Sequence, residues 1–198
     1  MGARSTKPDP PGAGRNQLRI GGGVWRSRVL PFPDAPGLRP TPDRVRQTLF
    51  NWLGQTLHGM TCLDAFAGSG ALGFEAASRG AERVVMCEAN GVVARALTGS
   101  AALLAADQCN IVPCSVFEWL RACTLRFDVV FCDPPFSENL HASFLAALTP
   151  YLVENALVYV ESAQPLELLV ASMSGYEVAK SSKAGSVYFG LLRLNSAG

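Results

Sequence analysis

From residue 60 onward, short apolar segments alternate with segments whose apolar residues have helical spacing. Strands are predicted at residues 61–66, 83–87, 110–113, 127–132 and 156–161, and helices at 70–79, 91–106, 116–122 and 140–151. Two more apolar segments, 176–181 and 186–194, are joined through a short polar turn and predict a hairpin. Alternating strands and helices indicate a parallel sheet covered on both faces. The predicted fold class is α/β, with a mostly parallel seven-stranded sheet that ends in a C-terminal antiparallel hairpin.

The segment before residue 60 has a different organisation. Residues 1–16 are rich in proline, glycine and charge and are predicted to form a disordered tail. Residues 17–40 contain three consecutive glycines and several prolines, and predict a short arm or hairpin followed by a loop. Thr41 or Asp43 is expected to cap a helix that extends to Leu53. We therefore expect three parts: a tail (1–16), an arm (17–40) and one main domain (41–198).

Length and composition exclude several classes of protein. The chain has 198 residues, of which 48% are hydrophobic and 17% charged, so it can bury a sizeable core. It contains no apolar run of the ~18 residues that span a bilayer, and residues 1–14 lack the apolar segment of a secretory signal. We expect a cytoplasmic monomer. The six cysteines form no Cys-x-x-Cys pair and are expected to be core residues, so no metal site is predicted.

A glycine-rich turn follows the first strand of the predicted domain. Residues 64–70 read DAFAGSG, so the backbone can turn tightly and approach a ligand at the start of the next helix. Gly68, Gly70 and Gly73 also satisfy the weak dinucleotide pattern G-x-G-x-x-G. Asp64 favours a different ligand, because a carboxylate there would repel a pyrophosphate but suits an ammonium group such as that of S-adenosylmethionine. The predicted cofactor contacts in this turn are Asp64, Phe66, Gly68, Ser69 and Gly70.

Two later strand ends add candidate cofactor contacts. Glu88, followed by Ala89, ends the second strand, and its carboxylate can accept both hydroxyl groups of a ribose. Ser115 and Val116 follow the third strand, where Ser115 can contact an adenine ring. Each polar residue also has a purely structural interpretation: Asp64 and Ser115 as helix caps, and Glu88 as an ordinary charge at a strand end.

Residues 133–136, Asp133, Pro134, Pro135 and Phe136, follow the apolar strand predicted at 127–132. Consecutive prolines fix the backbone and leave carbonyl groups pointing outward in a rigid loop. An amino group on a nucleobase is a poor nucleophile because its lone pair is delocalised into the ring. Asp133 and the Pro134 carbonyl can accept its two hydrogens and direct the lone pair at a methyl donor, while Phe136 stacks on the base. These four residues predict methylation of a base amino group.

Basic residues gather at the N-terminal end. Residues 1–46 contain nine basic and three acidic residues, a net charge of +6, whereas the rest of the chain carries −5. Arginine makes forked hydrogen bonds to phosphate and stacks on bases, so this end can dock on a nucleic acid. A solvated face without a partner explains the charge equally well. The candidate RNA contacts are Arg19, Trp25, Arg26, Arg28, Arg39 and Arg44.

With these motifs in view, the sequence resembles the bacterial 16S rRNA guanine-N2 methyltransferases between residues 18 and 194. The most specific part is residues 38–53, which read LRPTPDRVRQTLFNWL. The glycine turn and the segment 133–136 also match. The chain departs from the family pattern at Gln47, where glutamate is usual, at Ser115, where Asn or Asp is usual, and at Ala89 and Asn90, where a second acid is common.

The resemblance implies a Rossmann-like S-adenosylmethionine-dependent methyltransferase with an arm that faces RNA. It implies methyl transfer to N2 of one guanine in 16S rRNA, within a small ribosomal subunit (30S) that is assembled or assembling. It also gives Thr41 and Arg46 a role, closing over the cofactor carboxylate or gripping RNA phosphate. Two alternatives stay open: methylation of adenine N6 or cytosine N4 in DNA, which uses the same chemistry, and a non-catalytic RNA-binding assembly factor.

Overall fold

The main sheet of the computed structural model has seven strands in the order β5-β4-β3-β6-β7-β9-β8. The structure describes residues 16–135, 140–171, 173 and 175–195. The first five strands in this order pair in parallel, and β9 and β8 pair antiparallel at one edge. This arrangement confirms the predicted fold class. The strands are β3 (Thr61–Asp64), β4 (Arg83–Cys87), β5 (Cys109–Val112), β6 (Phe127–Cys132), β7 (Leu152–Ser162), β8 (Tyr176–Ala184) and β9 (Val187–Leu194).

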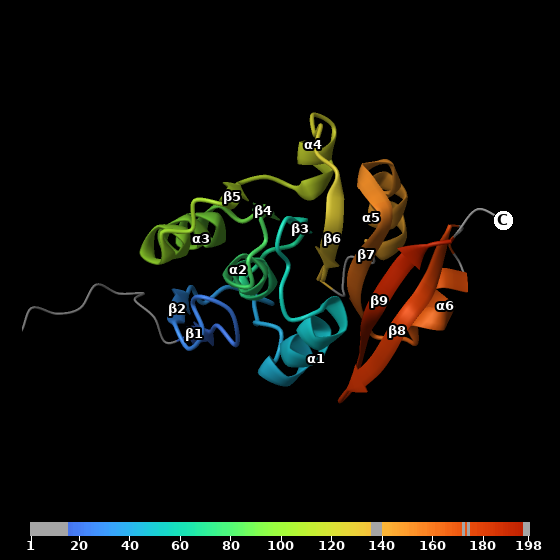
Figure 1. Cartoon of the computed structure of the whole chain (residues 1–198), viewed down its shortest axis with the longest axis horizontal. Coiled ribbons are helices and arrows are strands. Elements are labelled where there is room, and N and C mark those ends of the chain that lie inside the picture. The colour runs from blue at the N-terminus through green and yellow to red at the C-terminus, as the bar shows by residue number, and fades with distance from the viewer. Residues whose placement is uncertain (1–15, 136–139, 172, 174, 196–198) are drawn as a thin grey trace, which may run out of the picture.

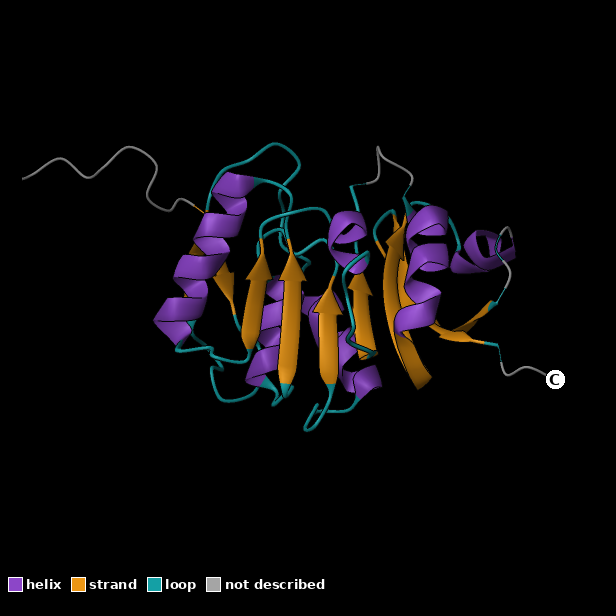
Figure 2. Cartoon of the chain, turned by 90° about the horizontal axis from the view of Figure 1, so that it is seen from above, coloured by secondary structure: helices purple, strands orange, loops and turns teal. Residues whose placement is uncertain are grey.

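Helices cover both faces of this sheet (Figure 2). Side chains alternate along each strand, so Cys62 and Tyr159 join one core with α1, α2 and α3, whereas Leu63 and Val158 join a second core with α4, α5 and α6. No described helix combines the length and apolarity that crossing a membrane requires. The helices are α1 (Asp43–Leu53), α2 (Ala71–Ser78), α3 (Gly91–Leu104), α4 (Val116–Leu120), α5 (His141–Leu148), the 3-10 turn η2 (Thr149–Tyr151) and α6 (Leu166–Ala171).

The predicted N-terminal hairpin is present and packs against the main domain. Strands β1 (Asn16–Arg19) and β2 (Val29–Phe32) pair antiparallel, and the connecting loop lies on α2 (Figure 1). Gly21 donates its N–H to Glu75 at 2.7 Å, and the N–H of Val24 reaches the Ser78 carbonyl at 2.7 Å. Leu18, Leu30 and other apolar side chains of the hairpin join the core around α1, α2 and α3.

Two local predictions differ from the structure, and one helix was missed. Neither Thr41 nor Asp43 caps α1, whose N-cap residue is Pro42 without a side-chain hydrogen bond. The Thr41 side chain is instead hydrogen-bonded to Glu161, and Asp43 is paired with Arg46. The long helix predicted at 140–151 ends at Leu148 and continues as η2, so β7 begins at residue 152. Helix α6 was not predicted, because six residues are too few for a helical period to stand out.

Candidate active site

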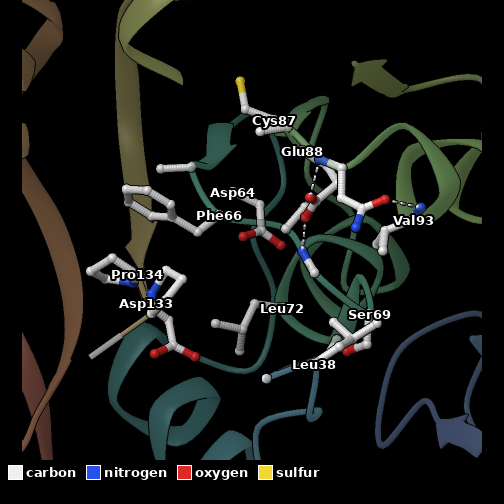
Figure 3. Close-up of a pocket in the computed structure, with 18 of the residues that line it drawn as sticks. Leu38, Asp64, Phe66, Ser69, Leu72, Cys87, Glu88, Val93, Asp133 and Pro134 are labelled. Carbon is white, nitrogen blue, oxygen red and sulfur yellow. Dashed lines mark hydrogen bonds between the residues drawn. The ribbon is translucent and has the colours of Figure 1, made fainter. Parts of the chain in front are cut away.

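A cavity of about 1050 Å³ lies at the carboxyl edge of the parallel strands. This edge is where open α/β sheets bind their ligands. Its walls come from the ends of β3, β4, β5, β6 and β7 and from the loop that precedes α1, and Figure 3 shows Asp64, Glu88 and Asp133 around it. The predicted site residues that line the cavity are Arg39, Thr41, Asp64, Phe66, Gly68, Ser69, Glu88, Ala89, Ser115, Val116, Asp133, Pro134 and Pro135.

The glycine turn brings the first carboxylate to this cavity. Gly68 and Gly70 have φ angles of 51° and 80°, a left-handed conformation that glycine adopts without strain. Gly70 lies behind the turn, where an added Cβ would meet the side chains of Phe74 and Leu97. The turn therefore needs glycine both for its backbone conformation and for its packing.

Asp64 is both a cavity residue and a helix-capping residue. Its carboxylate accepts the N–H of Gly73, in the first turn of α2, at 2.9 Å. The residue is 3% exposed, and burial raises its pKa to about 7, which Glu88 reinforces and the Gly73 hydrogen bond opposes. A cationic ligand group would relieve this cost by stabilising the ionised carboxylate.

Glu88 is oriented by the backbone around it. One carboxylate oxygen accepts the N–H of Gly68 at 2.9 Å and the other accepts the N–H of Asn90 at 2.7 Å. These bonds join the end of β4 to the glycine turn and hold the carboxylate at the cavity wall (Figure 3). Each oxygen has a second lone pair, so the group can still accept hydroxyl hydrogens from a ligand.

Ser115 caps α4 and also lines the cavity. Its hydroxyl accepts the N–H of Phe117 at 3.3 Å, which agrees with the structural interpretation of this residue. Val116 is buried beside it, and Cys87 closes the same part of the cavity. A contact between Ser115 and an adenine ring stays a prediction.

Asp133 and Pro134 follow β6 and face the cavity from the side opposite Glu88 (Figure 3). Pro135 also contributes to the wall, and Phe136 lies outside the described residues. Burial raises the pKa of Asp133 well above its ordinary value, and the neighbouring carboxylates of Glu161 and Asp64 add to the rise. Burial and the neighbouring carboxylates therefore disfavour the ionised form of Asp133.

A further carboxylate, Glu161, was not singled out from the sequence. It lines the cavity, is 7% exposed and follows β7 residue Val160, which pairs with Cys132. Asp133 and Glu161 thus occupy neighbouring strand ends. The sequence contained a usable signal, because an acid at the end of a predicted buried strand met the same criterion as Glu88.

Arg46 does not reach the cavity, which corrects its assignment as a cofactor contact. It is 3% exposed and donates from Nη2 to the Arg19 carbonyl and to Asp43, both at 2.6 Å. Its Nε and Nη1 are buried without a hydrogen-bond partner among the described residues. The side chain joins the hairpin to α1 rather than facing a ligand.

The remaining predicted RNA contacts lie outside the cavity. Arg19, Arg26, Arg28 and Arg44 are exposed, and Arg28 donates to the Leu103 carbonyl of α3 at 3.1 Å. Trp25 is half-buried against the core, and its backbone N–H is bonded to Ser78 at 2.9 Å. Among the predicted RNA contacts, Arg39 alone is at the rim of the cavity.

The cysteines are present as free thiols. Cys62, Cys87 and Cys132 are buried, and the other three are partly buried. Burial raises the pKa of all six thiols above the ordinary value. In the described part of the chain, His, Cys, Asp and Glu side chains form no group of three or more that could hold a metal ion.

Comparison with known proteins identifies the family. The family model described as "Conserved hypothetical protein 95" matches residues 18–193. "Ribosomal RNA small subunit methyltransferase D" of Escherichia coli (strain K12) is 45% identical over 158 residues, which cover 79% of this chain and 79% of that protein. The protein of the same name from Haemophilus influenzae is 42% identical over 161 residues, covering 78% of this chain and 83% of that protein.

A solved structure shares this architecture over most of the chain. It is described as "Putative methyltransferase yhhF from Escherichia coli" and aligns with a TM-score of 0.80 at 38% identity, covering 92% of this chain and 100% of that chain. The resemblance inferred from the motifs is thereby confirmed. The chain belongs to the ribosomal RNA small subunit methyltransferase D family.

Proposed function

We propose that this protein transfers a methyl group from S-adenosylmethionine to the exocyclic N2 of one guanine in 16S rRNA. The observation that supports this most directly is a single cavity that contains Asp64, Glu88 and Asp133 at three strand ends. Asp64 suits the ammonium group of the methyl donor and Glu88 suits its ribose hydroxyls. Asp133 suits the amino group of a base. The names of the relatives support small-subunit rRNA as the substrate.

The residues present fit the cofactor. Asp64 is a buried carboxylate whose pKa is raised by burial and by Glu88, and the cofactor's ammonium group supplies a positive charge that stabilises its ionised form. Glu88 is held at the wall to accept the ribose hydroxyls, and Ser115 and Val116 border the place of the adenine ring. When bound, S-adenosylmethionine supplies an electrophilic methyl group.

The chain's own contribution to the reaction is to orient the acceptor nitrogen. Asp133 and the carbonyl of Pro134 accept hydrogen bonds from the two N2–H groups and direct the nitrogen lone pair into the cavity. The proton that N2 loses after methyl transfer goes to Asp133 or to solvent. Holding the reacting atoms in a near-attack arrangement contributes most of the rate enhancement in such a displacement. The sequence further predicts that Phe136 stacks on the base. The ionised form of Asp133 is the stronger acceptor, and burial raises its pKa, so transfer is expected to fall as the pH is lowered.

The RNA approaches from the N-terminal side in this proposal. Exposed Arg19, Arg26, Arg28 and Arg44 on the hairpin and α1 bind phosphates, and Arg39 lies between them and the cavity. The substrate is RNA within an assembled or assembling 30S subunit, and the enzyme acts as a cytoplasmic monomer. Thr41 holds the loop at the rim through its bond to Glu161.

Nucleoside mass spectrometry of small subunits treated with the purified protein and S-adenosylmethionine tests this proposal. The wild type is expected to add N2-methylguanosine at one position of 16S rRNA. Asp133→Ala should lower the rate at least ~100-fold while the cofactor still binds, because orientation of the nitrogen is lost. Asp107→Ala, which alters an exposed aspartate away from the cavity, is the matched control. N6-methyladenosine, N4-methylcytidine or no methylated product would contradict the proposal.

A further inference from the structure

The feature that goes beyond the transfer chemistry is the pair of carboxylates at the ends of β6 and β7. The parallel register places Cys132 opposite Val160, so Asp133 and Glu161 come next to each other on adjacent strands. Neighbouring strands lie ~4.8 Å apart, a spacing that lets two carboxylates contact neighbouring atoms on one edge of a base. Both residues line the cavity.

Glu161 is held rigidly as a hydrogen-bond acceptor. The hydroxyl of Tyr159 donates to its Oε1 at 2.7 Å, and the Thr41 side chain bonds to the same carboxylate. The backbone carbonyl of Glu161 accepts from Nε2 of the buried His141 at 2.7 Å. These three bonds fix both the backbone and the side chain, although transfer of the methyl group requires none of them.

Two hydrogen bonds favour the ionised form of Glu161. Burial raises the pKa of Glu161, but the hydrogen bonds from Tyr159 and Thr41 oppose the rise. Asp133 has no such bonds among the described residues, and its pKa is raised well above the ordinary value, in part by Glu161 itself. Glu161 therefore presents a fixed hydrogen-bond acceptor to whatever lies beside the amino group on Asp133.

The atom beside the amino group differs among the bases. On the Watson–Crick edge of guanine the C2 amino group is flanked by N1–H, which is a donor, whereas N3 flanks it on the other side. On the same edge of adenine and cytosine the amino group is flanked by a ring nitrogen lone pair, which is an acceptor. Enzymes that act on an extruded base read it through this edge. A carboxylate at this position accepts a hydrogen bond from guanine and repels the lone pair of the other two bases.

We propose that Glu161 is the residue that selects guanine, its carboxylate accepting N1–H while Asp133 and Pro134 hold the N2 amino group. This inference rests on the proposed function, because it needs the target base in this cavity. It also explains how a tetrapeptide suited to three different bases acts on one of them. Specificity then comes from the end of β7, whereas the reaction type comes from the end of β6.

Small subunits carrying 2-aminopurine in place of the target guanine provide the test. The position is first located by nucleoside mass spectrometry, and the substituted rRNA is made by ligation. 2-Aminopurine retains the C2 amino group but has a lone pair at N1. The wild type is expected to prefer guanine in kcat/KM by at least ~10-fold, because 2-aminopurine cannot donate the N1–H hydrogen bond to the Glu161 carboxylate.

Glu161→Gln should lower this preference at least ~10-fold, because the side-chain amide can donate to the N1 lone pair. Glu154→Gln, the same change at an exposed position of β7, should leave the preference unchanged. The ratio of the two substrates is measured within one protein preparation, so partial unfolding of a variant does not alter it.

Two outcomes distinguish this inference from the proposed function. If the wild type does not methylate guanine at N2, the proposed function is wrong and the inference is overturned with it. If guanine is methylated but Glu161→Gln keeps the wild-type preference over 2-aminopurine, the proposed function stands and the role of Glu161 is overturned.

Discussion

The Asp64 carboxylate accepts a hydrogen bond from the backbone and also lines the cavity. Its bond to the Gly73 N–H stabilises the first turn of α2, and helix N-termini favour negative charge. Burial nevertheless outweighs this and raises the pKa to about 7. Below that pH the folded protein holds a proton on Asp64, and above it the carboxylate is ionised. The residue thus changes charge in the range where the protein is expected to work.

Binding of S-adenosylmethionine is therefore expected to weaken about tenfold per pH unit below 7, because Asp64 must lose its proton to face the ammonium group. Titration calorimetry at pH 6, repeated in buffers of different ionisation enthalpy, measures the proton released on binding. Near pH 8 the release should fall toward zero.

Glu88 and Asp133 also line the cavity and could contribute to the pH dependence of binding. The variant Asp64→Asn separates the contribution of Asp64 from theirs. This variant should bind the cofactor more weakly at pH 8 and lose most of the pH dependence. Asp107→Asn, at an exposed turn, should keep both properties. An unchanged pH dependence in Asp64→Asn would assign the titration to another group.

At the scale of elements, the hairpin β1–β2 is joined to α2 through close backbone contact. Gly23 has a φ angle of 73°, and a Cβ at this position would overlap the Ser78 carbonyl. Ser78 in turn donates its hydroxyl to the Gly22 carbonyl at 2.6 Å. Gly23 is thus required for docking, since any larger residue there separates the loop from the helix.

Gly23→Ala is expected to lower the free energy of unfolding by about 2–4 kcal/mol, through left-handed strain and the clash with Ser78. Gly37→Ala is the matched control. Gly37 has a similar φ of 77°, but no atom lies within 4 Å of an added Cβ. Gly37→Ala should therefore lower the free energy of unfolding by only about 1 kcal/mol. Urea denaturation followed by circular dichroism measures both values. Equal losses would show that close approach does not hold the hairpin in place.

At the scale of the whole molecule, charge is separated along the chain. The N-terminal 46 residues carry +6 and the remainder −5, and the hairpin β1–β2 lies at the opposite end of the molecule from β8 and β9 (Figure 1). The exposed arginines of the described part, residues 16–46, with Arg39 at the cavity rim, form a basic side that can steer a polyanion toward the acidic cavity residues.

Arg26→Ala is expected to weaken binding to small-subunit RNA several-fold and to reduce the slope of log K against log salt by about 1. Arg193→Ala, on β9 at the far end, should change neither, since its exposed pair with Glu177 contributes little. Filter binding between 50 and 200 mM salt (about the range in which phosphate contacts dominate) measures the slope. Identical slopes for the two variants would exclude a phosphate contact at Arg26.

Local sequence patterns were sufficient for the parts of the protein that depend on neighbouring residues. The glycine turn at 64–70 and the segment that begins at Asp133 each follow an apolar strand, and parallel strands bring their carboxyl ends to one edge. The sequence by itself therefore determined the fold class, the edge of the sheet that forms the cavity, and three of its four carboxylates.

Only the tertiary structure decided which distant residues meet. Glu161 lies beside Asp133 because β7 pairs with β6, and Thr41 reaches Glu161 because the loop before α1 closes over this edge. The same long-range packing buries Arg46 between the hairpin and α1, although the sequence placed it at the cofactor. Strand register and loop closure join residues far apart in the chain, so no local pattern encodes them. They determine which carboxylates lie side by side at the cavity.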